Sequence, residues 1–207
     1  MYDSAMELSA PLRVVTSAVD GDVLGVLARA DTEFTVSDLR LRIDRSAEGI
    51  RRALGRLVEQ GIVIRRSVGR VSSYRLNRSH LAAPAILDLA ELPMLLRRRI
   101  GDEIGTWPSP PLFAAIFGSA ARNEMRADSD IDIVLVGDVI GTPAGEERVA
   151  GLARSISEWT GNDARLLVYS ESEVRGRFGD EAILTEILED GIPLAGDRRA
   201  FRRLVGA

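Results

Sequence analysis

The stretch that decides the fold of this chain is FGSAARNEMRADSDIDIVLV, residues 117–136. Before it comes LFAAIF, residues 112–117, a short apolar run of strand length. It ends in a second apolar run, IDIVLV, residues 131–136, which is rich in β-branched residues. The sequence therefore predicts two strands, joined by a polar excursion that begins with glycine and serine and ends with two aspartates.

The polar residues of this stretch suit the binding of phosphate and metal. A glycine after a strand lets the backbone approach a phosphate, and the amides after Gly118 and the Ser119 hydroxyl can donate to its oxygens. Asp130 and Asp132, two residues apart on a strand, point to one face about 7 Å apart and offer oxygen ligands for Mg²⁺. Either half alone is also compatible with an ordinary turn or with surface charges.

Taken together, residues 117–136 closely resemble the motif of the DNA polymerase beta-like nucleotidyltransferase superfamily, in its minimal (MNT-like) branch. That motif is an apolar residue, Gly-Ser, ten residues and Asp-x-Asp. The resemblance implies transfer of a nucleotide, foremost AMP from ATP or another NTP, to a hydroxyl of a protein or small-molecule acceptor. Two Mg²⁺ ions are implied as cofactors, with Asp130 and Asp132 as catalytic metal ligands and Gly118 and Ser119 as nucleotide-binding residues.

The resemblance also implies a third carboxylate on a later strand, which binds metal and acts as the general base. Asp163 matches best, since it stands directly before the strand expected at residues 164–170, although Ala164 and Arg165 depart from the usual apolar continuation. An aspartate that opens a strand from a Gly-Asn-Asp turn is the alternative. Asp138 is a weaker competitor.

Arg122 lies where relatives carry the sequence ARGE, and here Asn123 replaces the glycine. The guanidinium suits two roles. It can bind a triphosphate in a bidentate manner, or it can pair with Glu124 or Asp128 at the surface.

The amino-terminal part of the chain is a basic module in an acidic protein. The formal net charge is -4 and all 27 basic residues are arginines, which a GC-rich coding sequence would explain. From Arg40 to Arg78, however, 11 arginines face only Asp44, Glu48 and Glu59. This local excess favours a polyanionic partner.

Periodicity predicts three helices and a β-hairpin in this module. The helices are expected within residues 11–29, loosened at Gly21, within 35–42, capped by Thr35 or Ser37, and from Ser46 to Gly61. Two strands are expected on either side of residues 67–69.

This order, from Phe34 to Asn77, resembles a winged helix-turn-helix, and the sequence LGRLVEQGIVIRRSVGRVSSYRLN carries the resemblance. It implies binding of double-stranded DNA, with the third helix in the major groove and the hairpin on the flanking backbone. A homodimer is the usual arrangement for such readers. The alternative is a module used only for protein contacts. The candidate DNA-binding residues are Ser46, Arg51, Arg52, Arg56, Arg65, Arg66 and Arg70.

The expected fold is a two-domain α/β protein. Residues 1–80 form the winged helix, residues 81–106 form a helical linker, and residues 107–207 form a nucleotidyltransferase domain with a small mixed sheet flanked by helices. After the second strand we expect a helix over 145–160, a strand over 164–170, and helices over 172–178 and 181–188, before Gly191 and an arginine-rich tail.

Composition excludes several other classes of protein. The chain has no cysteine and a single histidine, His80, which excludes disulfides and thiolate zinc sites. Neither a membrane span nor a signal peptide is recognisable, so we expect a cytoplasmic protein. Two other functions stay open. One is a transcription regulator that senses a nucleotide without turnover, and the other is a toxin–antitoxin component.

Overall fold

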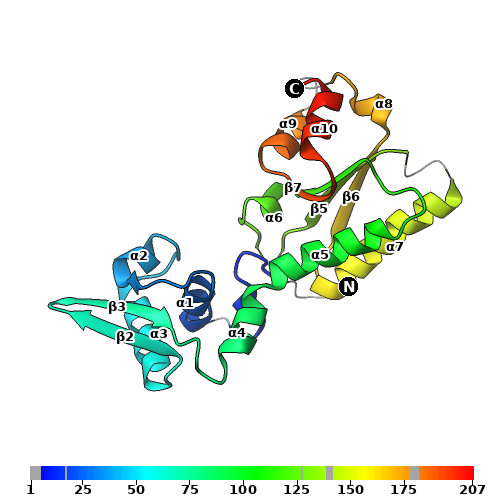
Figure 1. The fold of residues 1–207 in the computed structure, drawn as a ribbon. Helices are drawn as coiled ribbons and strands as arrows, with labels where there is room; N and C mark the ends of the chain where they lie inside the picture. Colours follow the sequence, from blue (N-terminus) through cyan, green and yellow to red (C-terminus); the bar gives the residue numbers. More distant parts are fainter. Residues whose placement is uncertain (1–5, 17, 127, 139–141, 178–181) are drawn as a thin grey trace. The chain divides into compact units, whose positions relative to one another are not determined.

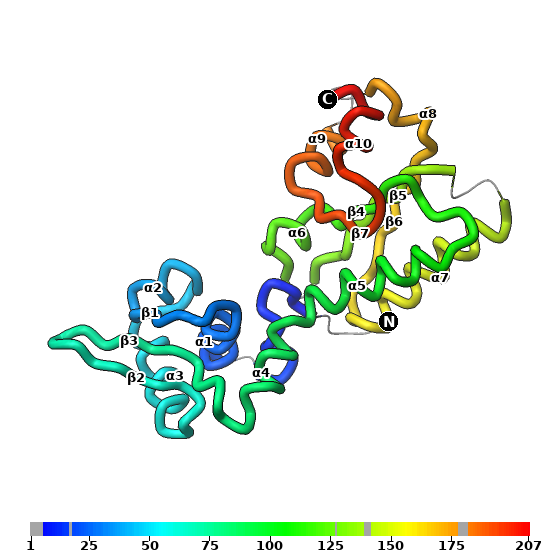
Figure 2. Tube along the Cα trace, viewed as in Figure 1, coloured from blue at the N-terminus to red at the C-terminus, as the bar shows by residue number. Residues whose placement is uncertain are grey.

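The computed structural model of the protein describes residues 6–16, 18–126, 128–138, 142–177 and 182–207. It divides the chain into two compact units. The amino-terminal unit is Ala10–Pro93, and the carboxy-terminal unit combines Met94–Ala207 with residues 6–9. Figures 1 and 2 trace both units along the sequence. The stretch that we expected to be a linker is shared between the two units.

The amino-terminal unit contains helices and a three-stranded antiparallel sheet with the strand order β1-β3-β2. Strand β1, only two residues long, was not expected from the sequence. The elements are the 3-10 turn η1 (Pro11–Val14), α1 (Val19–Ala28), β1 (Phe34–Thr35), α2 (Val36–Arg40), α3 (Ala47–Glu59), β2 (Val63–Val68), β3 (Val71–Leu76) and α4 (Ala83–Ala90).

Local side-chain bonds set the starts of α2 and α3. The Thr35 side chain accepts from the backbone N–H of Asp38, and the Asp38 carboxylate accepts from the backbone N–H of Thr35, which is a capping box. The Ser46 hydroxyl accepts from the N–H of Gly49, 3.1 Å away, and caps α3. Ser46, a candidate DNA-binding residue, therefore has a structural role at the start of this helix.

The expectation that the helix is loosened at Gly21 is wrong. Gly21 lies inside the first turn of α1, and η1 ends before that helix begins. A Cβ atom at this position would lie 3.0 Å from the carbonyl oxygen of Thr16. The glycine is required by close backbone approach between η1 and α1, and it does not mark a break in the helix.

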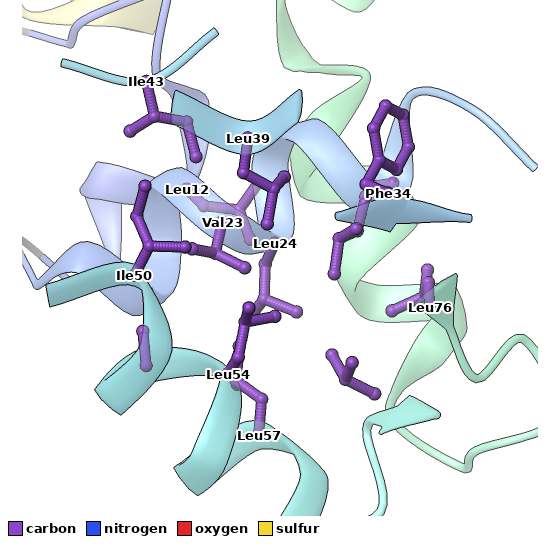
Figure 3. Packing of buried hydrophobic residues seen from close by; sticks show 14 of the residues in the cluster. Leu12, Val23, Leu24, Phe34, Leu39, Ile43, Ile50, Leu54, Leu57 and Leu76 are labelled. Carbon is purple, nitrogen blue, oxygen red and sulfur yellow. The ribbon is translucent and has the colours of Figure 1, made fainter. Parts of the chain in front are cut away.

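The core of the amino-terminal unit is built mainly by the apolar faces of the α-helices α1, α2 and α3, and Ile86 of α4 joins it (Figure 3). Apolar residues of α3 recur every three or four positions, so they form one stripe that packs on α1 and α2. Phe34 and Leu76 bring β1 and β3 onto the same core. Fully buried members include Val23, Leu27, Leu39, Ile50 and Leu54.

One buried carboxylate ties three segments of this unit together. Asp22 in α1 accepts hydrogen bonds from Arg13 Nε and Arg45 Nε, each 2.8 Å away. Its side chain is 5% exposed. Burial alone would raise the pKa of Asp22, but the bonds from the two guanidinium groups outweigh burial and hold that pKa below its usual value.

The carboxy-terminal unit has a mixed four-stranded sheet with the order β6-β5-β4-β7 (Figure 1). Strands β5 and β6 are parallel, while β4 is antiparallel to both β5 and β7. None of the helices that the structure describes, in either unit, has the length and apolar character to cross a membrane. The elements are α5 (Leu92–Gly105), β4 (Phe113–Phe117), α6 (Gly118–Ala121), β5 (Ile131–Val136), α7 (Pro143–Thr160), β6 (Ala164–Tyr169), α8 (Glu171–Val174), α9 (Ala182–Glu189), β7 (Ile192–Gly196) and α10 (Arg198–Val205).

The structure adds two elements to this unit and shortens one expected helix. The arginine-rich tail after Gly191 forms β7 and α10, which were not expected from the sequence. The helix expected over residues 172–178 is only the short α8, and Phe178 lies outside the described residues, as does Glu181 at the start of the next expected helix.

Helices cover both faces of the sheet. Residues of α5 and α7 pack with Ile116, Ile133 and Leu135 on one face. Residues of α8, α9 and α10 pack with Phe113, Val134 and Val136 on the other. Successive side chains along each strand point alternately into these two cores, so the core that a residue joins follows from its position in the strand.

We predict that Asp22→Asn lowers the free energy of unfolding of the amino-terminal unit by about 2 kcal/mol at pH 7, because two charge-assisted hydrogen bonds to a buried acceptor are weakened. Since the folded pKa of Asp22 is lowered, its stabilisation is present above its unfolded pKa of about 3.9 and is lost as the pH falls through the folded value. Urea denaturation followed by far-UV circular dichroism at pH 7 and pH 3 measures this difference.

Asp31→Asn is the matched control. Asp31 pairs with Arg78 in the same unit, but its side chain is 71% exposed. Its loss is expected to change stability by less than about 0.5 kcal/mol. Equal effects of the two substitutions at pH 7 would contradict the assignment.

Candidate functional site

The two aspartates at the start of β5 share one face of the sheet. Ile131 and Ile133 point into the core with α5 and α7, so Asp130 and Asp132 point to the opposite face, the one covered by α9. Asp132 lies opposite Phe117, the last residue of β4, in the antiparallel register. The carboxylates therefore stand where β4 ends.

Gly118 lies directly against one of these carboxylates. Its φ is +70°, and a Cβ atom built there would be 2.8 Å from Asp132 Oδ2. Both the backbone conformation and the close approach require glycine at this position. The structure thus brings together the glycine and the aspartate that the sequence pattern separates by thirteen residues.

The chain after Gly118 turns tightly through α6. The N–H of Glu124 donates to the carbonyl oxygen of Ser119, 2.9 Å away, and Asn123 takes a left-handed φ of +60°. Asparagine tolerates this conformation better than most residues, which explains how it can replace a glycine here. Ser119, the next residue after Gly118, is partly exposed.

Arg122 is held by carboxylates in the structure. Its Nε donates to Glu124 Oε2 at 3.1 Å, and its Nη1 bonds to Glu186 of α9. Asp190 lies 3.8 Å from the same Nη1. Of the two roles expected for Arg122, the structure shows the surface ion pair with Glu124. The same guanidinium links the end of α6 to α9 through Glu186.

The structure does not bring Asp163 into the aspartate pair. Among the described residues, no three acidic or histidine side chains stand close enough to hold a metal ion together. Asp163 is exposed, and its carbonyl oxygen accepts from the N–H of Ile131 at 2.8 Å. Asp138, the weaker competitor, is exposed beyond the far end of β5.

Asp130 and Asp132 fit a divalent cation by their own chemistry. Both offer hard oxygen donors on one face, as Mg²⁺ requires, and neither is fully buried. Gly118 leaves the space beside Asp132 that any larger residue would fill. These two residues are the metal-ligand candidates that the structure supports.

Sequence reasoning missed three residues around the pair. Arg165 Nη2 lies 2.6 Å from Asp130 Oδ2. Asn162, 1% exposed, donates from Nδ2 to the carbonyl oxygen of Ser129 at 3.0 Å, and so supports the loop directly before Asp130. Glu186 is close enough to influence Asp132 electrostatically. No local sequence pattern indicates these contacts, because each one joins segments that are far apart in the sequence.

The charges of the site oppose each other at Asp132. Burial raises the pKa of this carboxyl, the positive charge of Arg165 lowers it, and the negative charges of Asp130 and Glu186 raise it. The net pKa lies above the usual value. The binding of a cation beside Asp132 is therefore favoured electrostatically.

The candidate DNA-binding arginines fall into two sets that overlap at Arg51. Arg56 makes a bidentate pair with Asp20 of α1, with distances of 3.1 and 2.6 Å, and Arg52 pairs with Glu48 at 3.1 Å. Arg66 lies 3.8 Å from Glu33. These three pair with carboxylates of the same unit, and so does Arg51, whose Nη1 lies 3.8 Å from Glu48 Oε2.

The second set lines a groove between α3 and the β2–β3 hairpin. The groove has a volume of about 680 Å³ and is lined by Arg51, Arg65 and Arg70, together with Glu59 and Tyr74. Arg65 donates to the Ser72 hydroxyl at 2.9 Å. Three arginines thus line one open cavity.

Comparison with known proteins finds one family match, in the carboxy-terminal part of the chain. Residues 108–194 match the family model described as Polymerase beta, Nucleotidyltransferase. No curated protein matches the chain. A crystal structure of a toxin–antitoxin with AMP-PNP is 15% identical with a TM-score of 0.40, over 53% of this chain and 80% of its own. A mutant of the toxin–antitoxin MntA–HpeT is 14% identical with a TM-score of 0.38, over the same shares.

We predict that Gly118→Ala destabilises the protein by about 1 kcal/mol from its positive φ and by about a further 1 kcal/mol from the collision with Asp132. Gly69→Ala is the matched control. Gly69 has a φ of +61°, but nothing lies within 4 Å of its added Cβ. Urea denaturation of the two variants measures the difference, and a Gly118→Ala variant no less stable than Gly69→Ala would contradict the contact.

Proposed function

We propose that the carboxy-terminal unit is a metal-dependent nucleotidyltransferase. It transfers a nucleotide, foremost AMP from ATP, onto a hydroxyl of a protein or small-molecule acceptor. The observation that carries this proposal is the placement of Asp130 and Asp132 on one face of β5, with Gly118 against Asp132. This arrangement lies within the segment that matches the nucleotidyltransferase family model.

Each residue has a defined role in the proposed reaction. The amides after Gly118 and the Ser119 hydroxyl donate to the triphosphate. Asp130 and Asp132 hold Mg²⁺, which when bound stabilises charge on the phosphates and lowers the pKa of the acceptor hydroxyl. The acceptor oxygen forms a bond to the α-phosphorus while the bond to pyrophosphate breaks. Asp163, which is exposed and lies outside the aspartate pair, is our candidate to take the hydroxyl proton.

Arg122 has a positioning role in this proposal. Its bonds to Glu124 and Glu186 fix the turn after Gly118 relative to α9. To bind a triphosphate, the guanidinium would have to exchange these carboxylates for phosphate oxygens. A bidentate phosphate contact is chemically equivalent, so the exchange is possible when nucleotide arrives.

We also propose that the amino-terminal unit is a winged helix that binds double-stranded DNA, as a homodimer. Its order of helices, hairpin and short β1 fits this fold. The groove lined by Arg51, Arg65 and Arg70 supports the proposal, since three guanidinium groups along one cavity suit a phosphate backbone. Arg56, which is paired with Asp20, stabilises α3 against α1 in this account.

The transferase proposal predicts metal-dependent ATP binding. Calorimetric titration of ATP with Mg²⁺ is expected to show binding to the wild type, and at least about tenfold weaker binding to the Asp130→Ala, Asp132→Ala double variant, because the charge-assisted contacts through the metal are lost. Incubation with labelled ATP and cell lysate is expected to label a discrete species only with the wild type.

Asp138→Asn serves as the control, since Asp138 is exposed and lies beyond the other end of β5. It should bind ATP as the wild type does. Equal binding by the double variant would overturn the proposal. Binding without any transfer of label would favour the nucleotide-sensing regulator.

The DNA-binding proposal predicts a division among the arginines. Arg51→Ala and Arg70→Ala are each expected to weaken duplex binding roughly fivefold and to reduce the slope of log affinity against log salt by about 1, because each removes a phosphate contact. Arg56→Ala should leave affinity near that of the wild type. Fluorescence anisotropy with a labelled duplex between 50 and 200 mM salt, conditions chosen for a steep response, measures both quantities. An equal loss in all three variants would contradict the division.

A further inference from the structure

The backbone on both sides of Asp130 is bonded to the turn that precedes β6. On one side, the carbonyl oxygen of Ser129 accepts from Asn162 Nδ2 at 3.0 Å. On the other side, the N–H of Ile131 donates to the carbonyl oxygen of Asp163 at 2.8 Å. Because a peptide group on each side of Asp130 is bonded, the point from which its carboxylate leaves the backbone is held in place. One of these two bonds depends on a side chain, that of Asn162.

Asn162 is buried, and its amide uses both of its polar ends. The residue is 1% exposed. While Nδ2 donates to Ser129, Oδ1 accepts from the backbone N–H of Met6 at 3.1 Å. An aspartate or a leucine would have a similar shape, but an ionised aspartate has no donor and a leucine has neither donor nor acceptor. Among side chains of this size, asparagine is therefore the one that can join a carbonyl oxygen to an N–H group at a buried position.

The amino-terminal segment Met6–Ser9 contacts the same loop at a second point. The Ser9 hydroxyl donates to the carbonyl oxygen of Met125 at 2.7 Å, and Leu8 lies in the same buried core as Met125. These residues were expected to lie in the winged helix, but they belong to the carboxy-terminal unit. The loop is thus held at its start by Ser9 and at its end by Asn162.

We propose that Asn162 and Ser9 are positioning residues of the transferase site, which hold the loop between Met125 and Asp130 so that the Asp130 carboxylate is placed for joint metal binding with Asp132. This inference rests on the proposed transferase function. Both side chains act through the backbone of the loop and not by contact with metal or nucleotide. Magnesium demands near-ideal octahedral geometry, so a small displacement of one carboxylate lowers the affinity of the pair.

Titration of the full-length protein with Mn²⁺ alone, followed by the electron paramagnetic resonance of free Mn²⁺, tests this role, since carboxylates that suit Mg²⁺ also bind Mn²⁺. Asn162→Ala is expected to bind Mn²⁺ about tenfold more weakly than the wild type, because it frees the peptide group next to Asp130. Ser9→Ala, which acts farther from Asp130, is expected to bind about threefold more weakly. Ser9→Thr keeps the hydroxyl and should restore the affinity of the wild type.

Thr142→Ala is the matched control for a loss of stability away from the site. The Thr142 hydroxyl accepts from the N–H of Gly145 and caps the start of α7, which at 18 residues is about 27 Å long and ends two residues before Asn162. This variant should unfold at a lower urea concentration than the wild type and yet bind Mn²⁺ equally well. Asn162 and Ser9 would give the same result if their role were only structural.

The outcomes separate this inference from the function on which it rests. Unchanged Mn²⁺ affinity in Asn162→Ala and Ser9→Ala, or an equal loss of affinity in Thr142→Ala, would overturn the positioning role and leave the transferase proposal standing. If circular dichroism shows that Asn162→Ala is unfolded, the two Ser9 variants decide, and a Ser9→Thr variant that binds no better than Ser9→Ala would overturn the role. Absence of Mn²⁺ binding by the wild type would overturn both proposals.

Discussion

The site of the carboxy-terminal unit depends on two neighbouring carboxylates, those of Asp130 and Asp132, at the start of an inner strand of its sheet. Asp130 and Asp132 stand on the same face of a central strand, where burial and the charge of Asp130 both disfavour the charge of Asp132. Two neighbouring residues determine the surroundings of these carboxylates. Gly118 brings only backbone against Asp132, which leaves space for a ligand, and Arg165 places a positive charge on Asp130. Because the negative charge of Asp132 is disfavoured, the site attracts cations before any nucleotide binds.

The amino-terminal unit manages its charges differently. Asp22 is nearly buried, but two arginines satisfy both of its oxygens, so it serves as a fixed junction between η1, α1 and the turn before α3. Other arginines are neutralised at the surface, as Arg56 is by Asp20. The arginines that line the groove between α3 and the hairpin are a subset of a basic sequence, and one acidic residue, Glu59, lines the groove with them.

Much of the fold could be predicted from periodicity because most elements bury one apolar face. The stripe on α3 and the alternation in β5 are local properties, and both led to the right element. Strand β7 escaped prediction because Ile192–Gly196 contains a proline and little alternation, and it becomes a strand only by pairing with β4 at a sheet edge. The two residues of β1 are likewise defined only by their partner, β3.

The sequence by itself determined the two chemical centres of this protein, the glycine–serine turn with its aspartate pair and the arginine-rich module. Both depend on residues that lie close together along the chain, so their spacing is visible without a fold. Only the tertiary structure decided which charges meet. The parallel pairing of β5 with β6 brings Arg165 to Asp130, and the packing of α9 brings Glu186 to Arg122. Such contacts depend on strand register and helix packing, which arise from the whole core and leave no mark in the local sequence.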